Sequence, residues 1–348
     1  MKKKYLLILI PALLSLSGCK DAEKQIYFTL WNDCDSLNTL MDYVEDVTNP
    51  SSDNYIPRED RIATFDMDGT FIGELYPTYF EYNLLEYRVL EDETYKDIAP
   101  VDVREAAQNI REFVRDGIPL PQGFDMIHAH AAAKAYAGMN LKEFDEYVKA
   151  YAKNDANGFK NMTYANSFYK PMLEVFDYLD ANGFTYYVVS GSDRFICRAL
   201  VDSIGIAPNR VIGMDVELKS TNQGDQDGVD YTQAVGEDII RTDNLLIKNL
   251  KENKVKQISQ EIGKVPVLSF GNSSGDCAMH NFCIGNTKYK SEAFMLIADD
   301  EEEDHVDLVE TAKRKAKWEE ANYNIISMKD DFKTIYGYDV EKVPFIFD

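Results

Sequence analysis

Short apolar segments alternate with helical segments along most of this 348-residue chain, and this alternation limits its fold more than any other feature. The apolar segments have the composition of buried strands; they are Arg61–Phe65, Phe184–Val189, Arg210–Leu218, Val265–Phe270 and Ala293–Ala298. Strands that alternate with helices predict an α/β fold, a mainly parallel sheet flanked by helices. Ligands of such sheets bind beyond the carboxyl ends of the strands, so we expect a functional site there.

A long helical insert separates the first two strands. From Leu75 to Asn166 apolar and aromatic residues recur at steps of three and four, and we find no convincing strand. Its aromatic residues are expected to form a core rather than a cofactor site. The predicted divisions are a signal at 1–19, an N-terminal segment packing on the core at 20–60, a core at 61–74 and 167–348, and the insert at 75–166.

The first nineteen residues have the pattern of an export signal. Three lysines follow Met1, and the apolar stretch from Tyr5 to Leu16 is too short to span a bilayer. Leu16-Ser17-Gly18-Cys19 resembles the lipobox of bacterial lipoproteins, which implies lipidation of Cys19 as the mature N-terminus. We therefore expect a protein of the bacterial cell envelope, anchored by lipid on the extracytoplasmic side of a membrane.

The charge balance excludes some partners. With 60 acidic and 37 basic residues, the formal charge is −23, and loss of the three signal lysines makes it −26. Such a chain offers no basic stripe for a phosphate backbone, so nucleic-acid binding is not expected. A 12% aromatic content argues against disorder. The sequence indicates no particular protein partner.

Four polar segments follow predicted strands or begin helices. They are Asp66–Thr70 after the first strand, Ser190–Asp193 after the second, Lys254 at a helix start, and Gly271–Asp276 after the strand that ends at Phe270. Paired carboxylates on a tight turn can act as a nucleophile and a proton carrier. Phosphoryl transfer also requires contacts to the phosphate oxygens, a fixed cation and metal ligands. The segments offer hydroxyl and backbone N–H groups, a lysine and further oxygen ligands for these purposes.

These four segments, in this order, resemble the haloacid dehalogenase (HAD) superfamily of phosphohydrolases. The resemblance covers roughly residues 61–300, and Asp66-Met67-Asp68-Gly69-Thr70 is its most specific motif. Ile56–Ala63 also resembles a subgroup of exported or lipoprotein members. The family implies a Rossmann-like core with a cap domain, and Leu75–Asn166 resembles the helical cap of phosphoserine-phosphatase-like members.

The resemblance implies a role for each matching residue. Asp66 would attack phosphorus and form an aspartyl-phosphate, and Asp68 would act as acid and then base. Ser190 and the N–H of Gly191 would bind the phosphoryl group. Lys254 would neutralise Asp66 and the transferred phosphate. The implied activity is hydrolysis of a phosphomonoester, with a small phosphorylated metabolite as the substrate.

The same resemblance implies Mg²⁺ as the cofactor. The Asp66 carboxylate, the Asp68 carbonyl, Asn272 and Asp276 would hold it. Asn272 departs from the family pattern, in which a carboxylate is usual, so the site would have one negative charge fewer and bind the metal more weakly. Glu74, at the start of the insert, is a candidate contact for the leaving group.

Two alternatives remain open at this stage. Gly271-Asn272-Ser273-Ser274-Gly275 fits the nucleophile elbow of a serine esterase, with Asp299 or Asp300 and His305 in the expected chain order. That interpretation leaves Asp66 and Asp68 without a role. The second alternative is a non-catalytic HAD-like lipoprotein that binds a ligand or partner.

Overall fold

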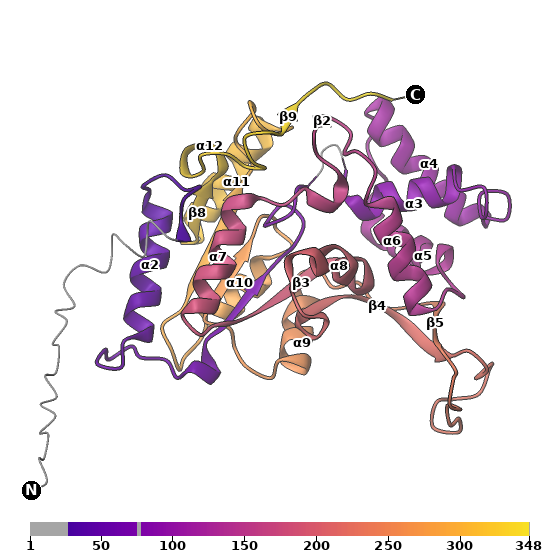
Figure 1. Cartoon of the computed structure of the whole chain (residues 1–348), viewed down its shortest axis with the longest axis horizontal. Helices are drawn as coiled ribbons and strands as arrows, with labels where there is room; N and C mark the ends of the chain where they lie inside the picture. The colour runs from indigo at the N-terminus through magenta and orange to yellow at the C-terminus, as the bar shows by residue number, and fades with distance from the viewer. Residues whose placement is uncertain (1–26, 75–77, 348) are drawn as a thin grey trace, which may run out of the picture.

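The computed structural model describes residues 27–74 and 78–347, and its centre is a mainly parallel β-sheet (Figure 1). The strands are β1 (Ile62–Phe65), β3 (Thr185–Asp193), β4 (Val211–Ser220), β5 (Ile239–Ile247), β6 (Leu268–Gly271), β7 (Glu292–Ile297) and β8 (Asn324–Ser327). Within the described residues these seven pair in the order β5-β4-β3-β1-β6-β7-β8, and β5 alone is antiparallel to its neighbour. The predicted Rossmann-like α/β fold is confirmed.

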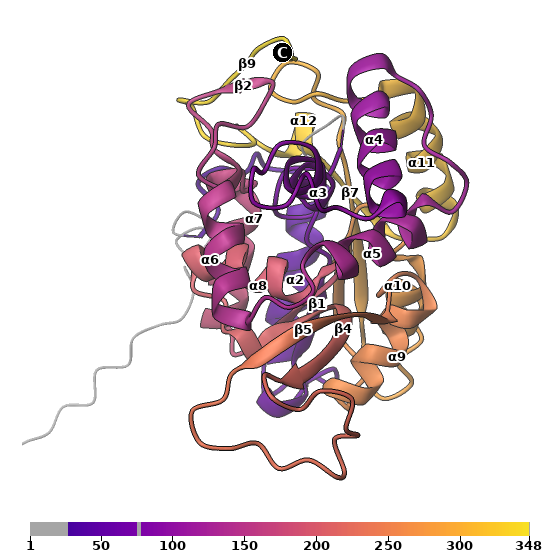
Figure 2. The same ribbon diagram turned by 90° about the vertical axis from the view of Figure 1, so that its right-hand side faces the viewer.

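Helices cover both faces of this sheet. They are α2 (Asp35–Thr48), α7 (Lys170–Ala181), α8 (Arg194–Val201), α9 (Glu252–Glu261), α10 (Cys277–Ile284), α11 (Leu308–Glu320) and the short α12 (Met328–Asp331). On β7, Phe294 and Leu296 pack into the core that contains α2, α7 and α8, whereas Met295 and Ile297 pack beside Trp318 of α11. Figure 2 shows α7 and α8 on one side of the sheet and α9 to α11 on the other. The two-residue period of the strand explains this division.

The described part of the segment before β1 packs on the core. Leu40, Tyr43 and Val44 of α2 are buried. The Tyr43 hydroxyl donates to the carbonyl of Val267 at 3.0 Å, beside β6. The predicted signal at 1–19 and Cys19 lie outside the described residues. None of the helices in the described ranges has the length and apolar character needed to span a bilayer.

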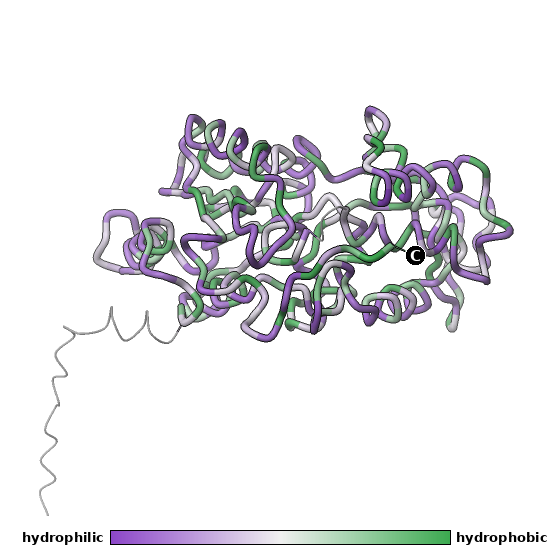
Figure 3. Tube along the Cα trace, turned by 90° about the horizontal axis from the view of Figure 1, so that it is seen from above, coloured by the Kyte–Doolittle hydropathy of each residue, from purple (hydrophilic) through white to green (hydrophobic). Residues whose placement is uncertain are grey.

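The insert folds as a helical cap. It contains α3 (Phe80–Leu90), α4 (Val101–Asp116), α5 (Phe124–Ala135) and α6 (Leu141–Tyr151). In Figure 3, hydrophilic and hydrophobic residues alternate along the outer helices, which is the pattern of helices with one buried face. The prediction of no strand in the insert is wrong at one place, because β2 (Phe159–Lys160) pairs with β9 (Glu341–Lys342) from the C-terminal end. The C-terminal segment therefore contacts the base of the cap.

Strand β5 joins the cap to the core. Asn222–Asp230 lies in the long connection between β4 and β5 (Figure 1). The sequence did not indicate β5 itself, whose residues are largely half-exposed. The backbone N–H of Arg241 donates to Met139 O at 3.0 Å, and Gly138 N–H donates to Arg241 O at 2.8 Å. An edge strand of the core sheet thus pairs with a turn of the cap.

Candidate active site

Asp66 and Asp68 lie at the carboxyl end of β1, in the middle of the sheet. The backbone N–H of Asp66 donates to Phe270 O at 2.9 Å, which extends the pairing of β1 with β6. Gly69 has a φ of +75° and lets the chain turn at once. A Cβ at Gly69 would lie 1.9 Å from Nδ2 of Asn272. The glycine therefore allows the segment after β6 to pack directly on the first segment.

Lys254 connects Asp66 to Asp276. It is the third residue of α9 and only 1% exposed. Its Nζ donates to Asp66 Oδ1 at 2.5 Å and to Asp276 Oδ1 at 2.6 Å. The helix start is held there because Lys251, with a left-handed φ of 53°, donates its N–H to Gly275 O. Three of the four predicted segments thus meet at one lysine.

Asp276 organises the loop after β6. Its Oδ2 accepts from the backbone N–H groups of Asn272 and Ser273 at 3.1 and 3.0 Å and from the Ser273 hydroxyl at 3.2 Å. Burial alone would raise the pKa of Asp276, but Lys254 and these donors lower it. Both oxygens of this ionised carboxylate are occupied, so its main role is to hold Lys254 and Asn272 in place.

The carboxyl end of β3 presents Gly191 and Ser192 to the site. Ser192 donates its hydroxyl to Asp68 Oδ2 at 2.8 Å, a contact that the sequence analysis missed. Ser190 is fully buried, and its Oγ accepts from Ser192 N–H at 3.0 Å. Gly191 and Ser192 are among the residues that line the cavity at Asp66, and Ser190 is not. Ser190 therefore supports the turn, and Ser192 reaches the carboxylate of Asp68.

The carboxylates of the site outnumber its lysines. Six line the small cavity of about 80 Å³ in the described structure, with two lysines: Asp66, Asp68, Glu74, Glu81, Asp125 and Asp276, and Lys248 and Lys254. Burial and the charge of Asp276 raise the pKa of Asp66, although Lys254 opposes them. Burial, followed by the charge of Glu81, raises the pKa of Asp68 to about 7. Excess negative charge enclosed in a small cavity favours a bound cation.

The residues present fit a hard divalent cation. Asp66, the Asp68 carbonyl and Asn272 supply the carboxylate, carbonyl and amide oxygens that Mg²⁺ prefers. No three His, Cys, Asp or Glu side chains in residues 27–74 and 78–347 form a metal site by themselves. A metal here would therefore need the backbone carbonyl and the amide oxygen in addition to the acidic side chains.

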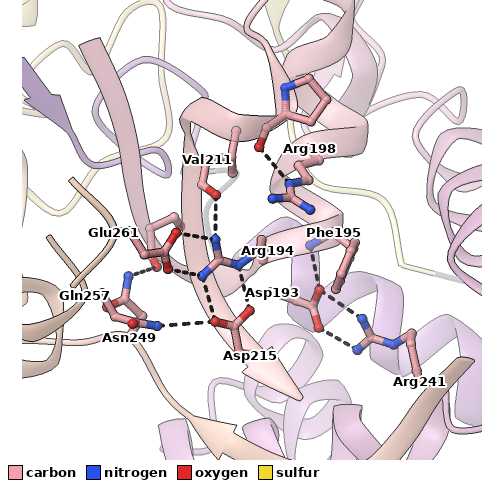
Figure 4. A network of polar contacts seen from close by, with 12 residues as sticks. Asp193, Arg194, Phe195, Arg198, Val211, Asp215, Arg241, Asn249, Gln257 and Glu261 are labelled. Atoms are coloured by element: carbon pink, nitrogen blue, oxygen red, sulfur yellow. Dashed lines mark hydrogen bonds and ion pairs between the residues drawn. The ribbon is translucent and has the colours of Figure 1, made fainter. Parts of the chain in front are cut away.

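A buried polar network fastens the cap beside the site. Glu81 of α3 accepts from Lys248 Nζ at 3.0 Å and from the backbone N–H of Asp193 at 3.1 Å. The carboxylate of Asp193 receives both terminal nitrogens of Arg241, which also lies 4.0 Å from the ring centroid of cap residue Phe144 (Figure 4). Of these residues, Asp193 alone belongs to a segment predicted for the site, and no role was predicted for it. Their charges are paired across the junction of cap and core.

A second, larger cavity adjoins the first. It has a volume of about 470 Å³ and lies between the cap and the end of the sheet beside α11. Among the described residues, five line both cavities: Glu74, Tyr79, Tyr82, Asp125 and Asn272. We call these five residues the neck. The predicted leaving-group contact, Glu74, lies in the neck, next to Asn272 Nδ2 at 3.4 Å.

The esterase arrangement is not assembled. The Ser273 hydroxyl donates to Asp276, whereas Nε2 of His305 pairs with Gly158 O at 2.9 Å and its ring stacks on Phe345. Asp299 accepts from the hydroxyl of Ser327. No serine, histidine and aspartate of this set contact one another among the described residues.

Together the fold and site define an α/β protein with a helical cap and a buried Asp–Lys–Asp cluster at the carboxyl end of a parallel sheet. No protein-family model matches the chain, and no curated protein matches it. A protein of unknown function from Anaerococcus prevotii is similar in structure, with a TM-score of 0.51 and 16% identity over 86% of this chain and 94% of that one. This similarity concerns the fold.

Two further solved structures are similar at lower scores. Cytosolic 5′-nucleotidase IIIB, bound to cytidine, has a TM-score of 0.45 and 10% identity over 79% of this chain and 82% of that one. A phosphoserine phosphohydrolase-like protein from Francisella tularensis has a TM-score of 0.40 and 12% identity over 76% of this chain and 94% of that one.

Proposed function

We propose that this protein is a Mg²⁺-dependent phosphomonoester hydrolase of the HAD type. One observation carries the proposal: Lys254 lies between Asp66 and Asp276 at the end of the central strand, with Asp68 two residues from Asp66 and bonded to Ser192. The proposal assigns Asp66 as the nucleophile, Lys254 as a fixed cation and Asp68 as the proton carrier, and these three residues line one cavity. It accounts for every segment that carried the family resemblance.

The reaction has two steps. A carboxylate oxygen of Asp66 attacks phosphorus and forms an acyl phosphate, while Asp68 donates its proton to the leaving alcohol oxygen. Water then attacks phosphorus, Asp68 accepts the water's proton, and the Asp66 carboxylate leaves as inorganic phosphate forms. A pKa of Asp68 near 7 suits both transfers. The ammonium group of Lys254 and the N–H of Gly191 compensate negative charge on the phosphoryl oxygens.

The metal would be held by Asp66, the carbonyl of Asp68 and Asn272, with Asp276 behind them. When bound, Mg²⁺ supplies positive charge that stabilises the transferring phosphoryl group. Asp66, Asp68 and Lys254 perform the nucleophilic, proton-transfer and charge-compensating parts of the reaction.

The test is hydrolysis of p-nitrophenyl phosphate by the purified protein, with Mg²⁺ and with EDTA. We expect Mg²⁺-dependent turnover that Asp66→Asn abolishes and that Asp53→Asn, a change of the same type at an exposed loop residue, retains. Ser273→Ala should retain turnover as well. Hydrolysis of p-nitrophenyl acetate that depends on Ser273 would favour an esterase. Absence of turnover on any phosphomonoester would favour a binding protein.

We also propose that the protein is anchored by lipid at Cys19 on the extracytoplasmic side of a membrane. Without the predicted signal at residues 1–19, the protein has a formal charge of −26 and little attraction to anionic lipids. The acyl chains would therefore supply the attachment. Membrane fractionation tests this proposal. Wild-type protein should sediment with membranes, and Cys19→Ala should not; membrane attachment of Cys19→Ala would contradict it.

A further inference from the structure

The neck between the two cavities is acidic and aromatic. Within the described structure its five residues are two carboxylates, two tyrosines and one amide, and none is lysine or arginine. A leaving group that departs from phosphorus into the larger cavity must pass these five residues. We propose that the leaving group carries an ammonium charge, so that the substrate is an alkylammonium phosphomonoester. This inference rests on the function proposed above.

Asp125 is the charge available for such a group. It is the second residue of α5 and exposed, and its Oδ1 accepts from the Tyr82 hydroxyl at 3.2 Å. No ion pair joins it to a basic residue in the described ranges. An ammonium group in the neck would thus meet a carboxylate whose charge is not already balanced by a lysine or arginine.

The two tyrosines add aromatic rings to the same place. The rings of Tyr79 and Tyr82 meet edge to face, with centroids 5.5 Å apart and an interplanar angle of 80°. Tyr82 also packs against Phe124, another residue of the larger cavity, with centroids 5.5 Å apart. Aromatic faces attract alkylammonium groups through their quadrupoles, most strongly where water is excluded. Rings beside a carboxylate favour a quaternary or alkylated ammonium.

Glu74 contributes a second carboxylate on the core side of the neck. It accepts from Asn272 Nδ2 at 3.4 Å and lines both cavities. A cation in the neck would meet the carboxylates of both Glu74 and Asp125. The structure therefore offers acidic groups from both the core and the cap.

The larger cavity contains one arginine, Arg314 of α11, which could suggest an anionic leaving group instead. Its Nε donates to Glu310 Oε1 at 3.2 Å, so its charge is already compensated by a residue of the same cavity. An anionic leaving group would have to pass Glu74 and Asp125 to reach it. The acidic residues of the neck, which a leaving group meets before Arg314, therefore favour a cation.

The experiment compares two esters of the same shape. One is choline phosphate; the other is its isostere, in which a quaternary carbon replaces the nitrogen. For the full-length protein with Mg²⁺, we expect kcat/KM to be about tenfold higher for the charged ester. Asp125→Asn keeps an oxygen for Tyr82 and should remove most of this preference. Asp116→Asn, an exposed cap residue that lines neither cavity, should keep it.

Equal kcat/KM for the two esters, or a preference that Asp125→Asn leaves intact, would overturn the inference. A direct binding measurement separates this result from failure of the proposed function. Calorimetry should show that choline binds the wild-type protein and binds Asp125→Asn about tenfold more weakly. If p-nitrophenyl phosphate and both esters are not hydrolysed while choline binds in this way, the phosphatase proposal fails and the ammonium site stands. Absence of choline binding overturns the site.

Discussion

The Nζ of Lys254 lies 2.5 Å from Oδ1 of Asp66, a residue 188 positions earlier in the chain. The same ammonium group holds Asp276 at 2.6 Å. One cation therefore serves two buried carboxylates, and the pKa of Asp66 is raised despite its ion pair. Asp66, the proposed nucleophile, lies in a position where its negative charge is costly. We therefore predict that substitution of Asp66 has opposite effects on stability and activity.

Asp66→Asn should stabilise the protein while abolishing hydrolysis. The amide removes a buried charge next to Asp276 and leaves Lys254 paired with Asp276 alone. In EDTA we expect the free energy of unfolding to rise by about 1 kcal/mol or more, as removal of functional strain often does. Urea unfolding measures it. In contrast, Lys254→Met should lower the free energy of unfolding by about 3 kcal/mol, because two buried carboxylates lose their partner. An equal change in the free energy of unfolding for the two variants would contradict this account.

Ser192→Ala should reduce turnover without loss of folding. The hydroxyl donates to Asp68 at 2.8 Å, and a hydrogen bond to a charged group contributes enough to change kcat/KM roughly tenfold to a hundredfold. Steady-state kinetics on p-nitrophenyl phosphate provides the measurement. Ser192→Thr retains the hydroxyl and should recover most of the activity. Wild-type kinetics in Ser192→Ala would show that Asp68 does not depend on this contact.

Asn272→Asp should strengthen metal binding. The substitution adds a carboxylate to the oxygen ligands proposed for Mg²⁺, and the charge of the ligands sets affinity for hard cations. We expect the Mg²⁺ concentration for half-maximal hydrolysis to fall about tenfold. A titration of activity against Mg²⁺ tests this. The control is Ser274→Asp, which adds a carboxylate two positions from Asn272 at a residue that lines neither cavity. An unchanged midpoint would place the metal away from Asn272.

His280 should make the fold sensitive to acid. Burial lowers its pKa to about 4, and its nitrogens contact Ser269 Oγ at 2.7 Å and Phe294 O at 3.1 Å. Because the folded state binds the proton less readily than the unfolded state, this stability is present above pH 6.5 and falls between pH 6.5 and 4.

Protonation of this one histidine should lower the free energy of unfolding by about 2 kcal/mol between pH 7 and 5. Urea unfolding at both values should show this loss in the wild-type protein and a smaller one in His280→Gln. If the two proteins lose equal stability, other groups control the acid response.

The sequence was sufficient to predict how Asp66, Lys254 and Asp276 come together. Each follows a strand end or begins a helix of the same parallel sheet, and such positions meet at one edge. The chain order of the strands did not matter, because the carboxyl ends of parallel strands lie together whatever their order. Local pattern therefore determined most of the core site.

The contacts between cap and core could not be predicted in this way. Glu81, Lys248 and Arg241 are ordinary charged residues on helix or strand patterns, and only docking of the cap pairs them in the interior. Strand β5 was missed because an edge strand with half-exposed residues lacks the apolar run of a central strand. Ser192 lies two residues beyond Ser190, the residue predicted from the motif. Its approach to Asp68 depends on the shift in register between β3 and β4 from Val189 to Asp193.

Acid quenching of the protein during hydrolysis of a ³²P-labelled phosphomonoester tests the central claim most directly. Asp66 as the nucleophile predicts label on the wild-type protein that hydroxylamine releases, as expected for an acyl phosphate, and no label on Asp66→Asn. Turnover by Asp66→Asn with label still attached to the protein would contradict the assignment of Asp66.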